Sequence, residues 1–124
     1  MTPSLYSNRQ EKLKSVLGEQ GIDGILITNL TSIRYICGFT GSSATCLILP
    51  ENQYFISDGI YTEQSKKQVS GFSRIIENLS HLELMGAKKR NLIPDGLKLG
   101  FEGEHLSVTQ YNTMMELFSK TDWV

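Results

Sequence analysis

The 124-residue chain has few of the residues on which specialised protein classes depend. It contains two cysteines, two histidines and three prolines, and 12 basic residues nearly balance 13 acidic ones. A formal net charge of −1 gives no electrostatic footprint for nucleic acid or for an acidic membrane surface. Cys37 and Cys46 have neither metal-binding nor CxxC spacing, so we expect two buried thiols that act as small hydrophobic residues.

Long apolar segments are also missing. Runs such as Gly24–Ile27 are far too short to span a bilayer, and residues 1–6 lack the basic and apolar stretches of a secretory signal. We therefore expect a cytoplasmic protein without a membrane partner. With 40% hydrophobic and 20% charged residues, the composition is typical of a globular domain that can bury one hydrophobic core.

Helix-like and strand-like segments alternate along the chain. Helices are predicted at about 4–20, 31–36, 60–69, 82–91 and 107–119. Strands are predicted at 24–28, 44–49, 53–57, 72–77, 98–102 and 122–124. The turn residues Pro50-Glu51-Asn52 predict a hairpin between the second and third strands. The sequence thus predicts one α/β domain, with a mixed sheet of about five or six strands flanked by helices.

Capping residues and one apolar stripe refine the helix predictions. Thr31 or Ser32 is expected to cap the helix that begins near residue 31, Asp58 the next helix and Ser107 the last. One face of the last helix is predicted to lie in the core, and it carries Val108, Tyr111, Met115 and Phe118.

The chain shows no recognisable catalytic constellation. His81 and His105 are far apart in sequence and belong to no HExxH pair, so we interpret both as surface or helix-start residues. His81 begins an HxE pattern typical of zinc deaminases, but the PCxxC partner motif is absent. Asp58 and Glu63 are explained as helix-start acids. We predict no catalytic residue and no metal ligand in this chain.

The segment Gly38–Ser43 is the best candidate for a site, because it holds two glycines and three hydroxyl groups. Its backbone could form a nest that binds an anion such as phosphate. It lacks, however, the lysine of a phosphate-binding loop and the glycine spacing of a dinucleotide loop. We therefore favour a tight turn into the strand that begins at Ala44, with the glycines present for their conformation.

Several segments, in order, resemble the N-terminal domain of the creatinase/prolidase/Xaa-Pro aminopeptidase family of M24 metallopeptidases. The opening helix and the GIDGILIT stretch at 21–28 are similar to the family's first helix and strand. Residues 32–42, SIRYICGFTGS, resemble the family's NIRYLTGFTGS, and residues 58–65, DGIYTEQS, resemble DGRYTEQA. Residues 99–102, LGFE, with the later Leu106, Ser107 and Tyr111, resemble its LGFE…LS…Y segment. The match spans nearly the whole chain.

The resemblance implies a ribonuclease H-like N-terminal domain that precedes a catalytic "pita-bread" domain. In this family the catalytic domain holds two divalent metals (Mn, Co or Zn), which activate a water for attack on the peptide bond before proline. Those ligand motifs are absent here. Residues 1–124 are therefore expected to form the non-catalytic N-terminal domain of a Xaa-Pro hydrolase, without its catalytic domain.

By the same resemblance, the domain contacts its own catalytic domain, mediates homodimer formation and narrows access for proline-containing peptides. The residues expected to form or support the substrate-access loop are Arg34, Tyr35, Phe39, Thr40, Ser42 and Ser43. Ile60 stands where the family commonly has Arg, and it cannot make a bidentate carboxylate contact. This departure leaves open a stand-alone binding or regulatory module, and the parent's activity as aminopeptidase, dipeptidase or creatinase-like enzyme also stays open.

Overall fold

The computed structural model describes residues 5–76, 93, 96–102, 107–118 and 121–124. The elements, in order, are α1 (Leu5–Glu19), β1 (Gly24–Ile27), α2 (Leu30–Cys37), β2 (Ala44–Ile48), β3 (Gln53–Ser57), the 3₁₀ helix η1 (Gly59–Tyr61), α3 (Thr62–Gln68), β4 (Ser73–Ile76), β5 (Lys98–Phe101), α5 (Val108–Leu117) and β6 (Asp122–Trp123). The helix expected at 82–91 and both histidines lie outside the described residues. The other predicted helices and strands are confirmed, with bounds shifted by a few residues.

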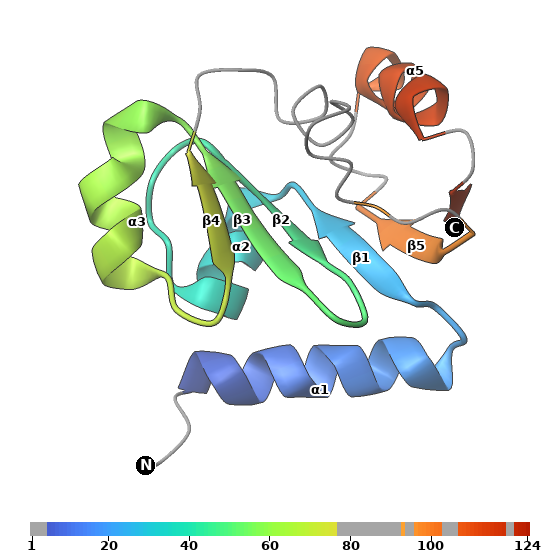
Figure 1. Cartoon of the computed structure of the whole chain (residues 1–124), viewed down its shortest axis with the longest axis horizontal. Coiled ribbons are helices and arrows are strands. Elements are labelled where there is room, and N and C mark those ends of the chain that lie inside the picture. Colours follow the sequence, from blue (N-terminus) through green and yellow to red (C-terminus); the bar gives the residue numbers. More distant parts are fainter. Residues whose placement is uncertain (1–4, 77–92, 94–95, 103–106, 119–120) are drawn as a thin grey trace.

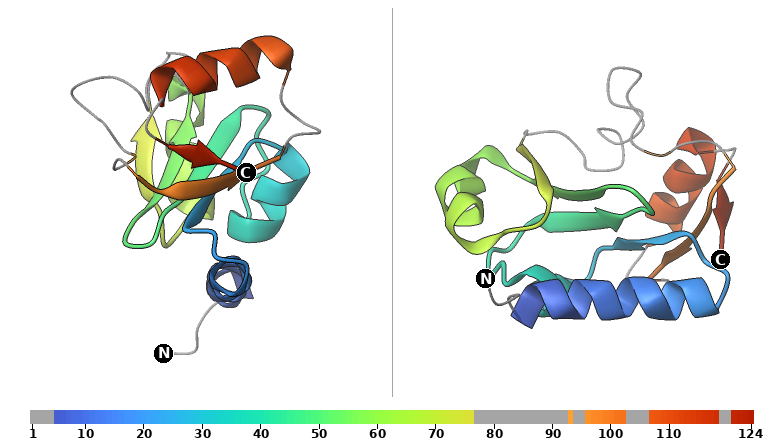
Figure 2. Two further views of the ribbon diagram at one scale, coloured as in Figure 1. Left: turned by 90° about the vertical axis from the view of Figure 1, so that its right-hand side faces the viewer. Right: turned by 60° about the horizontal axis from the view of Figure 1, so that its bottom comes forward.

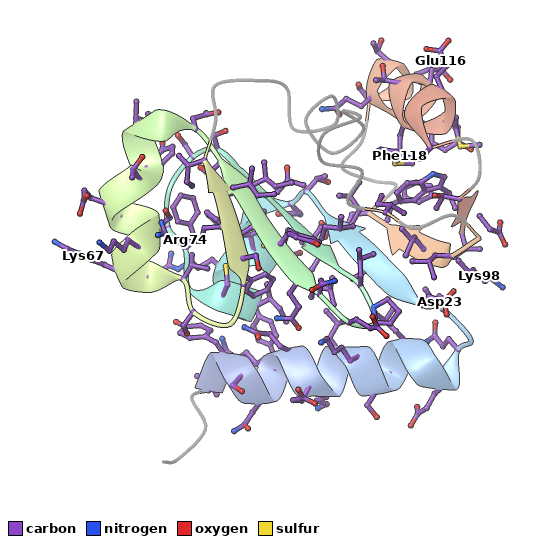
Figure 3. All side chains as sticks on the ribbon, viewed as in Figure 1. Asp23, Lys67, Arg74, Lys98, Glu116 and Phe118 are labelled. Carbon is purple, nitrogen blue, oxygen red and sulfur yellow. The ribbon has the colours of Figure 1, made fainter. Side chains whose placement is uncertain are left out.

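Among the described residues, six strands form one mixed sheet in the order β4-β3-β2-β1-β5-β6. β2 runs antiparallel to both β1 and β3, whereas β3–β4, β1–β5 and β5–β6 are parallel pairs. The hairpin predicted between β2 and β3 is confirmed, with Ala44 opposite Ser57 and Ile48 opposite Gln53. At the start of the β1–β5 pair, the Asp23 carboxylate accepts a hydrogen bond from the Lys98 amide at 2.8 Å, and both residues lie together in Figure 3.

Both faces of the central strands are buried, which explains why the sequences of these strands are almost continuously apolar. On one face Leu26, Leu47 and Ile56 pack in a cluster with Met114 and Phe118 from the α5 region. On the other face alternate residues of the same strands pack in a cluster with residues of α2, and α1 lies on this side of the molecule (Figures 1 and 2). The fold is therefore three layers, with α5 and α1 on opposite sides of the sheet.

The helix caps differ in part from the prediction. Asn29 caps α2, because its side chain accepts a hydrogen bond from the Thr31 amide at 2.9 Å, so the prediction of Thr31 or Ser32 was wrong. Asp58 occupies the N-cap position of η1, but it makes no side-chain capping hydrogen bond. Ser107 is confirmed as the cap of α5, where it forms a reciprocal capping box with Gln110.

The predicted core face of α5 was largely wrong. Phe118 is buried, but Val108 is 78% exposed and Met115 also reaches solvent. The helix instead turns Met114 into the core, fully buried, one helical turn before Phe118. Tyr111 is half-exposed, and its ring lies tilted by 45° to that of Phe101 on the sheet, with 5.8 Å between the ring centroids. The part of α5 that packs on the core is thus narrower than the predicted apolar face, since Val108 and Met115 lie outside it.

Candidate functional site

The loop between α2 and β2 is packed closely against aromatic rings. Gly38 ends α2 in the left-handed conformation, with φ of 82°, and its amide donates to the Arg34 carbonyl at 2.9 Å. Phe39 is 1% exposed and sits edge-on between the rings of Phe55 and Tyr61, at centroid distances of 4.8 and 5.3 Å. A Cβ atom at Gly41 would lie 2.3 Å from the Phe39 ring, so only glycine fits there. Phe39 therefore anchors the loop from inside the core.

Hydrogen bonds from η1 and α3 fix the exposed part of this loop. The Thr40 amide donates to Gln68 Oε1 at 3.0 Å, and Gln64 Nε2 donates to Thr40 Oγ1 at 3.0 Å. The Ser42 amide donates to the Tyr61 hydroxyl oxygen at 3.1 Å, and the two hydroxyl groups also share a hydrogen bond. Because these loop amides are already bound to side chains of the domain, the anion nest does not fit the loop, and the tight turn does.

The same hydrogen bonds act on the acidity of Tyr61. Donation from the Ser42 side chain and from its backbone amide holds the pKa of the exposed Tyr61 phenol below its ordinary value. A phenolate forms more easily when neighbouring donors stabilise its charge. The ionisation of Tyr61 is thus tied to its contacts with Ser42 in the loop.

The helix that carries the glutamines is held by a neighbouring strand. Arg74 of β4 donates to the Ser65 hydroxyl at 3.0 Å and to the Thr62 carbonyl at 3.3 Å, and Figure 3 shows it pointing toward α3. Gln64 and Gln68 lie one turn apart on this helix, so both amides face the loop. The loop, η1 and α3 therefore form one connected surface at the edge of the sheet.

The structure divides the six residues predicted for the access loop. Thr40 and Ser42 are exposed and lie against η1 and α3, whereas Phe39 is a core residue that cannot touch a substrate. Ser43 is half-buried, and its carbonyl accepts a hydrogen bond from Ser57. Arg34 is exposed on α2. Of these five residues, only Arg34, Thr40 and Ser42 have exposed side chains.

Tyr35, the sixth predicted residue, packs toward α1. Its ring lies 4.0 Å from the Arg9 guanidinium carbon, and its carbonyl accepts a hydrogen bond from Arg9 at 2.8 Å. The sequence prediction missed Arg9 as this partner, and it missed Gln64 and Gln68 as the loop's partners. Their i, i+4 spacing in a predicted helix was the one signal that could have placed both glutamines on a common face.

Glu102 joins the beginning of α2 to the end of β5. Its Oε1 accepts hydrogen bonds from the amides of Thr28 and Asn29, both at 2.8 Å. Its Oε2 accepts one from the Ser32 hydroxyl at 2.8 Å. A carboxylate at a helix N-terminus is stabilised by unpaired amides and by the helix dipole. Ser32 therefore binds Glu102 instead of capping the helix itself.

The described residues offer no metal centre and no accessible nucleophilic thiol. Among them, no three His, Cys, Asp or Glu side chains gather closely enough to hold a metal ion, so the two-metal centre does not fit this part of the chain. Cys37 and Cys46 are free and buried, as predicted. The hydrogen bond between their side chains lowers the pKa of Cys37 and raises that of Cys46, which burial raises further. Within the same part of the chain, no helix has the length and apolar character needed to cross a membrane.

Comparison with known proteins decides the family. The sequence profile of the creatinase/prolidase N-terminal domain matches residues 9–124. The chain belongs to this family. The creatinase/prolidase N-terminal domain described here is 37% identical over 115 residues to the uncharacterized peptidase YqhT of Bacillus subtilis. That match covers 92% of this chain but 32% of YqhT, so the chain spans about a third of the length of this relative.

Solved structures confirm the fold of the domain. The Xaa-Pro dipeptidase from Bacillus anthracis is 32% identical, with a TM-score of 0.81 over 96% of this chain and 33% of that one. The N-terminal domain of the cytoplasmic peptidase PepQ from Mycobacterium tuberculosis H37Rv is 29% identical, with a TM-score of 0.79 over 94% of this chain and 91% of that one. The family indicated by the sequence motifs and the predicted α/β fold with a mixed sheet are therefore confirmed.

Proposed function

We propose that this domain controls substrate access to the active site of a Xaa-Pro peptidase and helps its subunits to assemble, without catalysing the reaction itself. The observation that carries the proposal is the fixed, exposed loop edge. Thr40 and Ser42 are held by side chains of α3 and η1, while Phe39 anchors the loop in the core. A surface that is rigid before binding can restrict a neighbouring opening at little entropic cost.

The proposal includes the rest of the parent protein. A catalytic domain of the pita-bread type would hold two divalent metals (Mn, Co or Zn), and the parent would work in the cytoplasm as a homodimer. Its substrates would be proline-containing peptides. This is supported by the Xaa-Pro dipeptidase from Bacillus anthracis, of which this chain matches a third. All of the metal chemistry would belong to that catalytic domain.

The test compares this chain with the full-length parent, both supplied with Mn²⁺, on a Xaa-Pro dipeptide and on a longer Xaa-Pro peptide. We expect hydrolysis by the full-length protein only. In that protein, Ser42→Trp adds bulk to the loop edge and should lower kcat/KM for the longer peptide about tenfold more than for the dipeptide. Asn52→Trp is the matched control, because Asn52 lies in the turn at the opposite end of the β2–β3 pair.

Hydrolysis by the 124-residue chain alone would contradict the proposal, as would an equal effect of both tryptophan variants on both substrates. An inactive full-length parent would favour the second function, a non-catalytic binding or regulatory module. One observation favours that alternative: Ile60, next to Tyr61 in η1, is 83% exposed and presents an apolar side chain where a charged one is common.

A further inference from the structure

A groove of about 520 Å³ lies between α1, β1 and α2, and its lining includes no residue of η1 or α3. Its apolar lining comes from Leu13 and Val16 of α1, Ile25 and Ile27 of β1, and Ile36 of α2. The groove exists because α1 buries only Gln10 and Leu17 fully among its described residues. Leu13 also packs partly against the core, and together with Val16 it forms the α1 side of the open groove.

Charges of opposite sign line this groove toward the two ends of α2. Arg9 and Lys12 of α1 supply the positive charges, and the Tyr35 carbonyl near the end of α2 takes one of the five N–H donors of Arg9 and fixes its guanidinium. Near the beginning of α2 stands Glu102, whose Oε2 accepts one hydrogen bond, from Ser32, and can accept another. The charges are thus arranged for a ligand that is itself anionic at one end and cationic at the other.

We infer that this groove binds a short apolar peptide with free termini, two or three residues long. The peptide's carboxylate would pair with Arg9 and Lys12, its ammonium group with Glu102, and its apolar side chains would cover Ile25 and Ile27 of the groove floor. The volume is in the range of pockets that enclose small organic ligands, which is about 300–1,000 Å³. A single amino acid would leave much of it empty.

The charge pattern separates this ligand from other apolar occupants. A fatty acid has no group for Glu102, and an internal segment of a longer polypeptide has neither terminal charge. Because none of the groove residues takes part in the hydrogen bonds of Thr40 and Ser42, the inference does not depend on the proposed access function.

The test is calorimetric titration of this chain with tri-leucine, together with backbone amide NMR shifts to locate the binding. We expect shifts at α1, β1 and α2. Binding should weaken about three- to fivefold when the peptide's amine is acetylated, and by a similar factor when its carboxylate is amidated. Lys12→Glu should weaken binding by about the same factor, whereas Lys14→Glu, on the same helix but outside the groove, should not.

Val16→Trp, which fills the groove from a partly exposed position, should abolish binding while the amide spectrum stays that of a folded domain. The inference would be overturned by no binding of tri-leucine, by equal binding of free and end-blocked peptides, or by equal binding of octanoate. Shifts confined to Thr40, Ser42 and Tyr61 would overturn it too, and they would place the peptide at the access loop instead. The end-blocked peptides keep the test decisive even if Val16→Trp does not fold.

Discussion

Tyr61 contacts the loop through both its hydroxyl group and its ring. It accepts the Ser42 amide and shares a hydrogen bond with the Ser42 hydroxyl, while its ring packs on Phe39. The side chain is therefore both a structural contact and a titrating group.

The lowered pKa of Tyr61 predicts a pH effect with a definite sign. The folded domain binds the phenol proton less tightly than the unfolded chain, where the ordinary pKa is about 10. The folded state should therefore gain stability as pH rises through the folded pKa toward that ordinary value, and lose this gain as pH falls. Ser42→Ala removes the first cause of the shift and should move the Tyr61 ionisation back up.

Spectrophotometric titration of the tyrosine phenolates measures the pKa of Tyr61 directly, and we expect Tyr61 to be the tyrosine that ionises at the lowest pH. The lowest-pH component should vanish in Tyr61→Phe and shift upward in Ser42→Ala. Thr62→Ala, at the next position but outside the Ser42 contact, should leave it in place. A first ionisation that survives in Tyr61→Phe would show that another tyrosine carries it.

At the scale of elements, α2 depends on a residue far along the chain. Glu102 accepts hydrogen bonds from Thr28, Asn29 and Ser32 across 70 or more positions. Glu102→Gln removes the charge and replaces one acceptor oxygen by a donor, which would face groups that also donate. We expect a loss of about 1–3 kcal/mol in the free energy of unfolding, measured by urea denaturation.

The matched control is Glu116→Gln on α5, which lies on the outside of the molecule in Figure 3. It should change the free energy of unfolding by no more than about 0.5 kcal/mol. Equal losses in the two variants would show that the Glu102 contacts add nothing beyond a surface charge. A smaller loss for Glu102→Gln at high salt would indicate that the helix dipole provides most of the effect.

Local sequence patterns predicted the elements but not these long-range contacts. Runs such as those of β2 and β3 show their secondary structure within a few residues, because a strand buried on both faces needs apolar side chains throughout. The Glu102 contacts have no such local pattern. Asn29 was missed for a different reason: its capping hydrogen bond to the Thr31 amide is local, but the helix was predicted to begin at residue 31 and begins at Leu30. On α5, the pattern could not tell which side of a broad apolar stripe faces the sheet, and Met114 was missed.

At the scale of the whole molecule, β2 contributes residues to the hydrophobic clusters on both faces of the sheet. Every residue of this central strand is buried, and Leu47, fully buried, packs with Leu26 and Ile56 on the α5 side. Leu47→Ala should therefore cost about 2–5 kcal/mol of unfolding free energy, because it loses burial and leaves a cavity. Urea denaturation checks the value.

Val108→Ala is the control for this change, since Val108 is a large apolar side chain on the exposed side of α5. It should cost no more than about 0.5 kcal/mol. A cost similar to that of Leu47→Ala would mean that the apolar stripe of α5 is buried after all, as its spacing alone suggested.

The placement of β1 between β2 and β5 has a consequence for the order in which the domain is completed during synthesis. β1 can pair with β2 once the first half of the chain has emerged from the ribosome, but its parallel partner β5 lies about 70 residues later. Until then, β1 has an open edge, α2 lacks the carboxylate of Glu102, and the groove lacks its negative side. The nascent chain must keep that edge from pairing with other chains until the β5 segment arrives.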